Sequence, residues 1–298
     1  MLGVIVNPVS GSGKGLKVWK QMAGYLTKAS IRFNIKFTSE TGHASKIFDE
    51  YLKQSDIEKI LVVGGDGTIS EAIQNVINTN RPISLGYIPA GTGNDLAKSL
   101  GISLHPLAAL KQFLNGTEKM LDIGMVGERL FINSFGVGFD GAVVKAMQQN
   151  KLKKRLNYLK LGSLSYLFSI MSVLRSYQPL NISLFVDSHE YQIKNVWMVV
   201  VANQPYYGGG MKICPDACAN DGIFEICVIN GLTRWQIIRY IPMIYKGTHV
   251  NLPYVKVIRG QRVSIHSEQR MNAQADGEIK EYINEEISSM REKISIIY

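Results

Sequence analysis

The sequence predicts two regions, an α/β region with a parallel sheet and then a β-rich region. Over about the first 120 residues, short apolar runs rich in branched residues alternate with stretches whose apolar residues recur at helical spacing. After Leu121, apolar runs follow one another with turns between them. The first pattern indicates a parallel sheet covered by helices on both faces, and ligands bind such sheets beyond the carboxyl ends of the strands.

The first region is expected to contain four strands, each ending in Gly, Pro or polar residues. These strands are residues 2–8, 31–38, 59–65 and 82–89. Helical spacing predicts three helices between them, at residues 16–29, 43–55 and 68–79.

The second region is expected to contain strands joined by turns and interrupted by one helix, at residues 157–174. The strands are residues 129–139, 180–186, 189–203, 222–230, 256–267 and 271–279. A last short strand, KISIIY, could return to the first region, which the sequence alone does not decide.

Composition is that of a soluble globular protein, with 46% hydrophobic and 19% charged residues. No apolar run reaches the roughly 18 residues that cross a bilayer. The start, MLGVIVNPVSG, is expected to be a first strand and not a signal peptide, so we expect a cytoplasmic protein. Three cysteines, Cys214, Cys218 and Cys227, are expected to be buried structural thiols and not a disulfide or metal set.

The net charge is +9, and the basic residues are clustered. Seven basic residues and no acidic residue lie between Lys145 and Arg175, and an apolar, aromatic stretch follows Arg155 directly. Nucleic acid, an anionic membrane surface or simple solvation would each explain such a cluster. The adjoining apolar and aromatic residues favour a membrane surface. The alternative is that these apolar residues pack the second region and the lysines face water.

Three glycine-rich turns follow predicted strands: NPVSGSGKG (7–15), GGDGT (64–68) and PAGTGNDLA (89–97). None is a Walker A loop, because Pro8 stands where a glycine is needed and Gly15 follows Lys14. None fits the dinucleotide fingerprint, since the third glycine is missing. All three bring main-chain N–H groups and a helix N-terminus to one place, which predicts a phosphate-binding edge.

Asp66 lies between the glycines of the second turn, where bare phosphate would repel it. Its presence therefore implies a cation, Mg²⁺ first, between carboxylate and phosphates. The alternative is that Asp66 caps the helix that begins near Thr68. Capping leaves the flanking glycines unexplained.

Together, GGDGT and IPAGTGNDLA (88–97) resemble the diacylglycerol kinase catalytic-domain family, which includes sphingosine, ceramide and bacterial lipid kinases. NPVSGSGKG, FTSETGHA, LDIG, GVGFDGAVV, KLGSLSYL, the block from NQPYYGGG to GIFEI and a late DGE match in order, over essentially the whole chain. The resemblance implies an α/β nucleotide-binding domain (1–121 plus 285–298) and a β-sandwich lipid-substrate domain (122–284).

The resemblance also implies ATP and Mg²⁺ as cofactors. The nucleotide contacts it implies are Asn7, Gly11, Gly13, Lys14, Thr38, Gly64, Gly65, Asp66, Gly67, Thr68, Glu71, Gly91, Thr92, Asn94 and Asp95. Asp66, Asp95 and Asp122 are expected to be metal-binding acids of the cleft. Asp221 resembles the carboxylate of a second, structural Mg²⁺ site, completed by the carbonyls of Cys218 and Ile223.

Asp276 and Glu278 resemble the acidic pair that supplies the general base, so the expected catalytic residues are Glu278, Asp276 and Asp66. A lipid hydroxyl must lose a proton as it attacks the γ-phosphoryl group, and a carboxylate can accept it. Alternating positions on one strand would place both acids on the same face, and Glu278 is preferred as the base. The alternative is an ordinary polar turn.

The expected activity is ATP-dependent phosphorylation of a membrane lipid alcohol, diacylglycerol first, by a protein peripheral to the inner face of the membrane. A homodimer is plausible, and nucleic acid is not expected as a partner. The expected membrane contact comprises Lys151, Lys153, Lys154, Arg155, Tyr158, Leu159, Tyr166 and Phe168. One alternative is an NAD kinase, which shares GGDGT but is disfavoured by PAGTGNDLA. Another is a catalytically silent, nucleotide-binding membrane regulator, although every acid that the chemistry needs is present.

Overall fold

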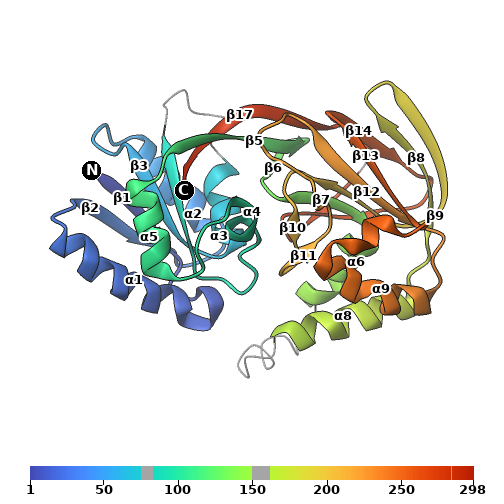
Figure 1. Ribbon diagram of the computed structural model, residues 1–298, viewed down its shortest axis with the longest axis horizontal. Helices are drawn as coiled ribbons and strands as arrows, with labels where there is room; N and C mark the ends of the chain where they lie inside the picture. The colour runs from blue at the N-terminus through green and yellow to red at the C-terminus, as the bar shows by residue number, and fades with distance from the viewer. Residues whose placement is uncertain (75–82, 150–161, 283) are drawn as a thin grey trace. The chain divides into compact units, whose positions relative to one another are not determined.

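A computed structural model describes residues 1–74, 83–149, 162–282 and 284–298 (Figure 1). The chain forms two compact units: the first is Met1–Ile123 with Arg291–Tyr298, and the second is Gly124–Met290. The sequence placed the boundaries at 121/122 and 284/285. The observed second boundary, between Met290 and Arg291, falls inside strand β17 (Ile287–Ile297). The start of this strand pairs with β14 and its end with β4, so no loop marks the boundary in the sequence.

The first unit contains the predicted parallel sheet, in the order β17–β4–β3–β1–β2. Its other strands are β1 (Leu2–Val6), β2 (Phe33–Phe37), β3 (Lys59–Gly64) and β4 (Ser84–Pro89). β1 and β4 are buried along their whole length, and β3 is buried after its first residue. Strands buried on both faces require helices on both faces, and this confirms the predicted α/β class.

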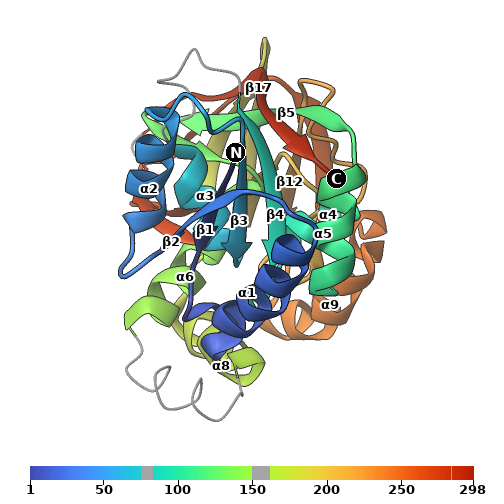
Figure 2. The ribbon, with the colours of Figure 1, turned by 90° about the vertical axis from the view of Figure 1, so that its left-hand side faces the viewer.

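Helices α1 (Ser10–Lys28) and α5 (Pro106–Asn115) cover one face of this sheet, and α2 (His43–Leu52) and α3 (Asp66–Ala72) cover the other (Figure 2). A short helix, α4 (Asp95–Leu100), follows β4. The sequence did not predict α5. Its close approach to β4 depends on Gly86, where any side chain would clash with the ring of Phe113.

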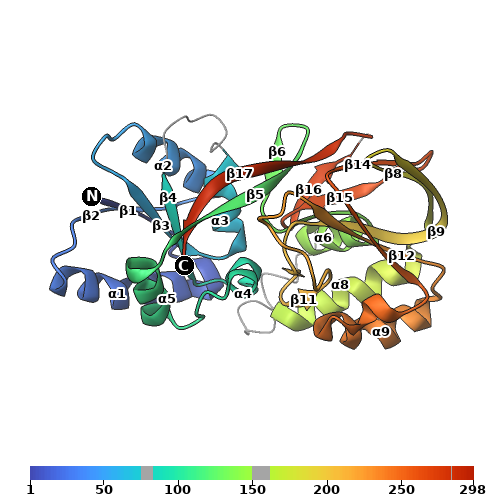
Figure 3. The same ribbon diagram turned by 45° about the horizontal axis from the view of Figure 1, so that its top comes forward.

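The second unit is largely antiparallel, with the path β16–β15–β7–β9–β8–β14–β17 and with β12 pairing both β9 and β13 (Figure 3). Strand β5 enters it from the first unit. The strands are β5 (Glu118–Val126), β6 (Arg129–Phe131), β7 (Ser134–Gly138), β8 (Leu180–Val186), β9 (His189–Ala202), β10 (Tyr206–Tyr207), β11 (Met211–Lys212), β12 (Phe224–Asn230), β13 (Val255–Gly260), β14 (Arg262–His266), β15 (Asn272–Ala275) and β16 (Glu278–Glu281).

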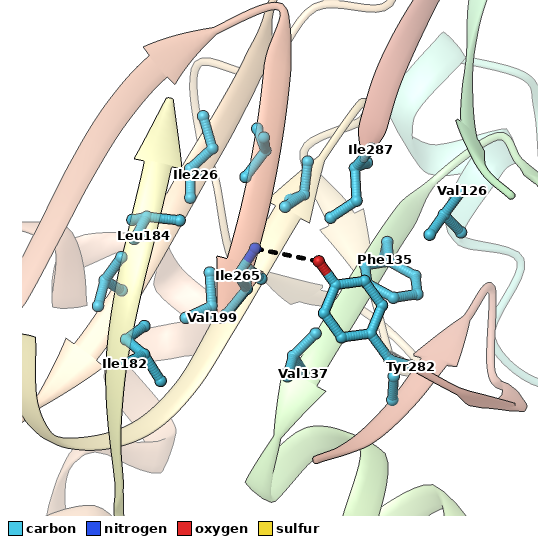
Figure 4. Packing of buried hydrophobic residues seen from close by; sticks show 14 of the residues in the cluster. Val126, Phe135, Val137, Ile182, Leu184, Val199, Ile226, Ile265, Tyr282 and Ile287 are labelled. Carbon is cyan, nitrogen blue, oxygen red and sulfur yellow. Dashed lines mark hydrogen bonds between the residues drawn. The ribbon is translucent and has the colours of Figure 1, made fainter. Parts of the chain in front are cut away.

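Two hydrophobic cores lie on opposite faces of the central strands of this unit. Val199 and Val201 of β9 point into a core between strands, where the backbone N–H of Ile265 donates to the hydroxyl of Tyr282 at 3.0 Å (Figure 4). Met198 and Val200 belong to the second core, which helices cover. Side chains alternate between faces along a strand, so a strand buried on both faces is apolar throughout.

Those covering helices are α6 (Phe139–Gln149), α8 (Gly162–Ser176) and α9 (Arg234–Lys246), with a 3₁₀ turn, η2 (Thr248–Asn251), after α9. The prediction of one helix in this region was wrong, since α6 and α9 were missed. The unbroken apolar run VWMVVVA (196–202) was the signal for a helical layer. A capping box at Thr233 and Gln236 marks the start of α9 in the sequence.

Two simpler expectations can be compared with the structure directly. Cys214 and Cys227 are buried as expected, but Cys218 is exposed, because it lies in a turn region between β11 and β12. Within the described ranges, no helix has both the length and the apolar character needed to cross a bilayer.

Candidate functional site

The three glycine-rich turns come together at the carboxyl edge of the parallel sheet. They follow β1, β3 and β4, and parallel neighbouring strands end at the same edge. A Cβ atom on Gly91 would lie 2.6 Å from the Cα atom of Gly65, and one on Gly11 would clash with the carbonyl oxygen of Ala90. Glycine is therefore required for these backbones to touch one another.

The conformation of the first turn is set by left-handed backbone and by hydrogen bonds of the Asn7 side chain. Gly11, Ser12 and Gly13 have φ values of 55°, 59° and 89°, so regular helix begins only after them. The Asn7 side chain donates to the hydroxyl of Thr68 at 3.0 Å. Asn7 and Thr68, both predicted nucleotide contacts, thus join the first turn to the second. The predicted contact Lys14 is exposed.

The third turn is organised by Asn94, whose φ is 53°. Its Oδ1 accepts from the N–H of Gly91 at 2.9 Å and from the hydroxyl of Tyr87 at 3.4 Å, and its Nδ2 donates to the carbonyl of Gly91 at 3.1 Å. The side chain of Asn94 therefore shapes the loop from within. Thr92, at the loop tip, is exposed.

Asp66 lies in the first turn of α3, and its Oδ1 accepts from the N–H of Leu96 at 3.1 Å, in the first turn of α4. It does not cap its own helix, whose N-cap is Gly65, so the capping alternative was wrong in that form. Asp95 is buried at the start of α4, 3.4 Å from the Lys98 ammonium. The turns thus bring two carboxylates and two helix N-termini together.

The field of these carboxylates reaches the buried phenol of Tyr87. Burial, followed by the charges of Asp66 and Asp95, raises the pKa of Tyr87 well above its ordinary value. Negative charge is therefore concentrated at the same edge as the anion-binding main chain, and a phosphate group would need a cation beside it.

The remaining predicted nucleotide residues lie in the same elements. Thr38 directly follows β2, and its N–H donates to the carbonyl of Val6 at 2.9 Å, which places it beside the end of β1. Gly64 accommodates the side chain of Thr68, since a Cβ atom would lie 2.6 Å from it. Gly67 and Glu71 belong to α3, where Gly67 is exposed and Glu71 is half-buried.

The first unit can be tested for its fit to Mg²⁺. In the part of the chain that the structure describes, no three or more His, Cys, Asp or Glu side chains form a metal-binding group. Mg²⁺ in phosphate sites is usually bound through one or two carboxylates and the phosphates themselves, a requirement that Asp66 and Asp95 meet. Asp122 has another contact: its Oδ1 accepts from the N–H of Glu292 at 2.8 Å and so connects β5 to β17.

In the second unit, Asp276 and Gly277 form the two-residue turn between β15 and β16, with φ values of 47° and 83°. Both values are left-handed, as in a type I′ hairpin. The carboxylate of Asp276 accepts main-chain hydrogen bonds of 2.8–3.1 Å from three consecutive residues, Ile132, Asn133 and Ser134. The prediction that Asp276 and Glu278 alternate on one strand was wrong, because Asp276 lies in the turn and anchors it.

Glu278 begins β16 and forms an ion pair with Arg129, whose Nη2 donates to Oε2 at 2.6 Å. The two side chains are 37% and 27% exposed, so the pair is accessible to solvent. Sequence reasoning missed Arg129. The two residues are 149 positions apart, and no local pattern connects them.

At the predicted structural cation site, the carboxylate of Asp221 is paired with an arginine. Asp221 Oδ2 accepts from Arg259 at 2.6 Å, and its Oδ1 accepts from the N–H of Ile223 at 3.0 Å. The thiol of Cys218 donates to Asn220 at 2.8 Å. Arg259 therefore already contacts this carboxylate, and the structural cation stays a prediction.

The second unit also contains an apolar cavity beneath α6, α8 and α9. Asp140 lies in its wall, and burial raises the pKa of that carboxyl to about 6, although Gln274 donates to it at 2.7 Å. Asp140 was given no role from the sequence, although it lies in GVGFDGAVV, one of the segments that resemble the kinase family. The other residues of the wall are Phe139, Val143, Ile170, Trp197, Met198, Tyr207, Met211, Ile229, Leu232, Ile237, Tyr240, Ile241, Ile244, His249, Leu252 and Val255.

The predicted membrane contact falls largely outside the described residues. This applies to Lys151, Lys153, Lys154, Arg155, Tyr158 and Leu159. Tyr166 and Phe168 belong to α8, but their side chains are not described.

Comparison with known proteins gives consistent matches for both units. The diacylglycerol kinase catalytic domain matches residues 1–126, and the YegS C-terminal NAD kinase beta sandwich-like domain matches residues 133–297. The chain is 30% identical to a diacylglycerol kinase of Bacillus subtilis, covering 92% of this chain and 88% of the relative. It is 28% identical to a diacylglycerol kinase of Mycobacterium tuberculosis, covering 98% and 93%.

A crystal structure of a diacylglycerol kinase from Bacillus anthracis superposes with a TM-score of 0.76 at 21% identity, covering 100% of this chain and 96% of that one. At this identity the likeness supports the two-domain fold alone.

Proposed function

Because the chain belongs to the diacylglycerol kinase catalytic-domain family of lipid kinases, we propose that it transfers the γ-phosphoryl group of ATP to the hydroxyl of a membrane lipid. Diacylglycerol is the first acceptor, and phosphatidic acid the product. The observation that carries the proposal is the convergence of three glycine turns and two carboxylates, Asp66 and Asp95, at one edge of a parallel sheet.

The glycine turns bind the triphosphate through main-chain N–H groups, because no side chain separates these backbones from the ligand. Asp66 and Asp95 would hold Mg²⁺, which when bound neutralises charge on the phosphates. The first unit thus acts mainly by positioning the nucleotide and stabilising charge, as expected for phosphoryl transfer.

We assign the general base to Glu278. As the lipid oxygen bonds to the γ-phosphorus and the bond to the ADP oxygen breaks, the hydroxyl proton passes to the Glu278 carboxylate. Asp276 is the weaker candidate, since its oxygens accept from three main-chain N–H groups. Arg129 holds Glu278 in place through their ion pair.

The apolar cavity of the second unit supports a lipid acceptor. Its wall is built almost entirely from aliphatic and aromatic side chains, which suit an acyl chain and not a dinucleotide. A soluble polar acceptor such as NAD would leave these groups without apolar contacts.

The proposal is tested with labelled ATP, Mg²⁺ and a panel of acceptors: diacylglycerol, phosphatidylglycerol and a sphingoid base in mixed micelles, and NAD in solution. We expect labelled lipid, with diacylglycerol the best substrate. Label in NAD, or ATP binding with no labelled lipid, would contradict the proposal. The Asp66→Asn variant supplies the background.

A further inference from the structure

Helix α9 has two faces of different chemistry. At 3.6 residues per turn, positions i, i+4, i+7 and i+11 lie along one side of a helix. On α9 this side, here called the outer stripe, consists of four exposed residues: Trp235, Arg239, Pro242 and Lys246. On the opposite side, four residues line the apolar cavity: Ile237, Tyr240, Ile241 and Ile244.

Trp235 is 81% exposed, whereas Trp19 and Trp197 are 7% and 3% exposed. An indole ring combines a large apolar surface with one N–H group, and tryptophan is enriched where membrane meets water. Two further exposed apolar residues lie nearby, Tyr245 on α9 and Met171 on α8. The Arg234 side chain donates to the carbonyl of Leu174 at 2.9 Å, and α8 and α9 lie side by side (Figure 3).

The charge of this surface has one sign. Helix α9 contains no Asp or Glu and three basic residues, Arg234, Arg239 and Lys246, all of them exposed. The α8 sequence likewise has no acid, and its last turn carries the exposed Arg175. An anionic partner would therefore meet attraction over both helices and no repulsion from them.

We propose that the outer stripe of α9, together with Met171 and Arg175 of α8, docks the second unit onto an anionic lipid surface, with Trp235 entering the membrane interface. Aromatic and basic side chains on one face are typical of helices that lie in the plane of a membrane. The inference rests on the proposed function, because docking would bring a lipid to the cavity assigned to its acyl chain. The inner side of the same helix lines that cavity. The residues of this surface do not include the basic segment 151–155, which lies outside the described residues.

The first experiment uses Trp235 as a probe, because the other two tryptophans are buried. Vesicles of phosphatidylcholine with phosphatidylglycerol are added to the protein without ATP or an acceptor. We expect a blue shift of emission, quenching by lipids brominated on the acyl chains, and loss of both at high salt. Unchanged emission with anionic vesicles, or an equal response to pure phosphatidylcholine, would overturn the proposal.

The second experiment measures vesicle sedimentation of variants. Replacing Arg239 and Lys246 together by Gln should weaken partition about 25-fold, since one basic residue near an anionic surface is worth about fivefold. Trp235→Ser should weaken it by about tenfold. The matched control, Lys28→Gln with Lys53→Gln, removes two exposed charges from the first unit and should bind within about twofold of the wild type. Equal losses in control and test variants would overturn the assignment to α9.

A third measurement separates this proposal from the proposed function. Turnover of a short-chain diacylglycerol in neutral detergent micelles does not require an anionic surface, so the outer-stripe variants should retain it. Vesicle binding without any lipid kinase activity would support the docking surface while refuting the proposed function. An emission shift that depends on protein concentration without vesicles would identify the occupant as a second copy of the chain and overturn the lipid assignment.

Discussion

Asp66 and Asp276 occupy the same dipeptide, Asp followed by Gly, yet the two units use it differently. In the first unit Asp66 starts a helix after a buried strand, and its carboxylate faces the N-terminus of the next helix through Leu96. In the second unit Asp276 lies in a hairpin turn and accepts from the main chain of residues 132–134. The comparison teaches that the element after the dipeptide decides the role of the acid. Before a helix, the acid lies at the phosphate-binding edge of the sheet; in a hairpin turn, it anchors its own sheet.

The largest effect is expected at Asp66. Asn in its place keeps an oxygen for the Leu96 N–H but removes the charge, so turnover should fall on the order of 10³-fold. The free energy of unfolding should change by less than about 0.5 kcal/mol. Labelled-ATP turnover and urea unfolding check the two values. A folded variant with a near-normal rate would show that Asp66, like Asp276, is not needed for turnover.

Glu278→Gln should lower turnover by about 100-fold or more, because the amide cannot accept the lipid proton. Gln still offers an oxygen to Arg129, so the ion pair is replaced by a hydrogen bond and the fold should survive. Steady-state kinetics in mixed micelles measures the loss, which should appear in kcat and not in KM.

The matched variant for Glu278 is Asp276→Asn. Asn tolerates left-handed backbone, but one acceptor oxygen is lost, so unfolding should become easier by about 1–3 kcal/mol. Turnover per folded molecule should stay close to that of the wild type. If this variant instead loses turnover without losing stability, the base is Asp276 and the comparison is reversed.

Asp140 extends the comparison to an acid in the interior. Its folded pKa of about 6 lies above the ordinary value of 3.8, so the folded protein holds a proton that the unfolded chain releases first. The free energy of unfolding should therefore fall as pH rises from about 4 through about 6, by about 3 kcal/mol in total. Asp140→Asn should lose that part of the dependence, as measured by urea unfolding between pH 4 and pH 8. An unchanged pH profile would contradict the buried, protonated acid.

The smallest effect is expected at Arg259. This side chain is 56% exposed, so breaking its pair with Asp221 in Arg259→Gln should cost less than about 1 kcal/mol. Burial raises the pKa of nearby Glu225, Asp216 adds to that shift, and Arg259 opposes it. Because Arg259 already pairs with Asp221, a chelator should not change the thermal midpoint of the wild-type protein. A lower midpoint with chelator would restore the predicted structural cation.

The fold was more accessible to sequence reasoning in the first unit than in the second. Alternating periodicities of helix and strand predicted the succession of strands and helices along the chain, and α5 was the helix missed there. In the second unit most strand regions were found, but the predicted strands 129–139, 256–267 and 271–279 each break into two. Strands β5, β10 and β11 and helices α6 and α9 were missed. The run VWMVVVA (196–202) contained the missing information, since only a strand covered on both faces is apolar throughout.

The sequence by itself determined that three glycine turns would end neighbouring strands and that acids would stand among them, because turn chemistry and strand period are local properties. Only the tertiary structure decided the partners of those acids. Asp276 meets residues 132–134, Glu278 meets Arg129, and Asp221 meets Arg259 through contacts between segments far apart in the chain. A carboxylate's role depends on which donors reach its oxygens, and chain folding brings those donors from positions that no local pattern specifies.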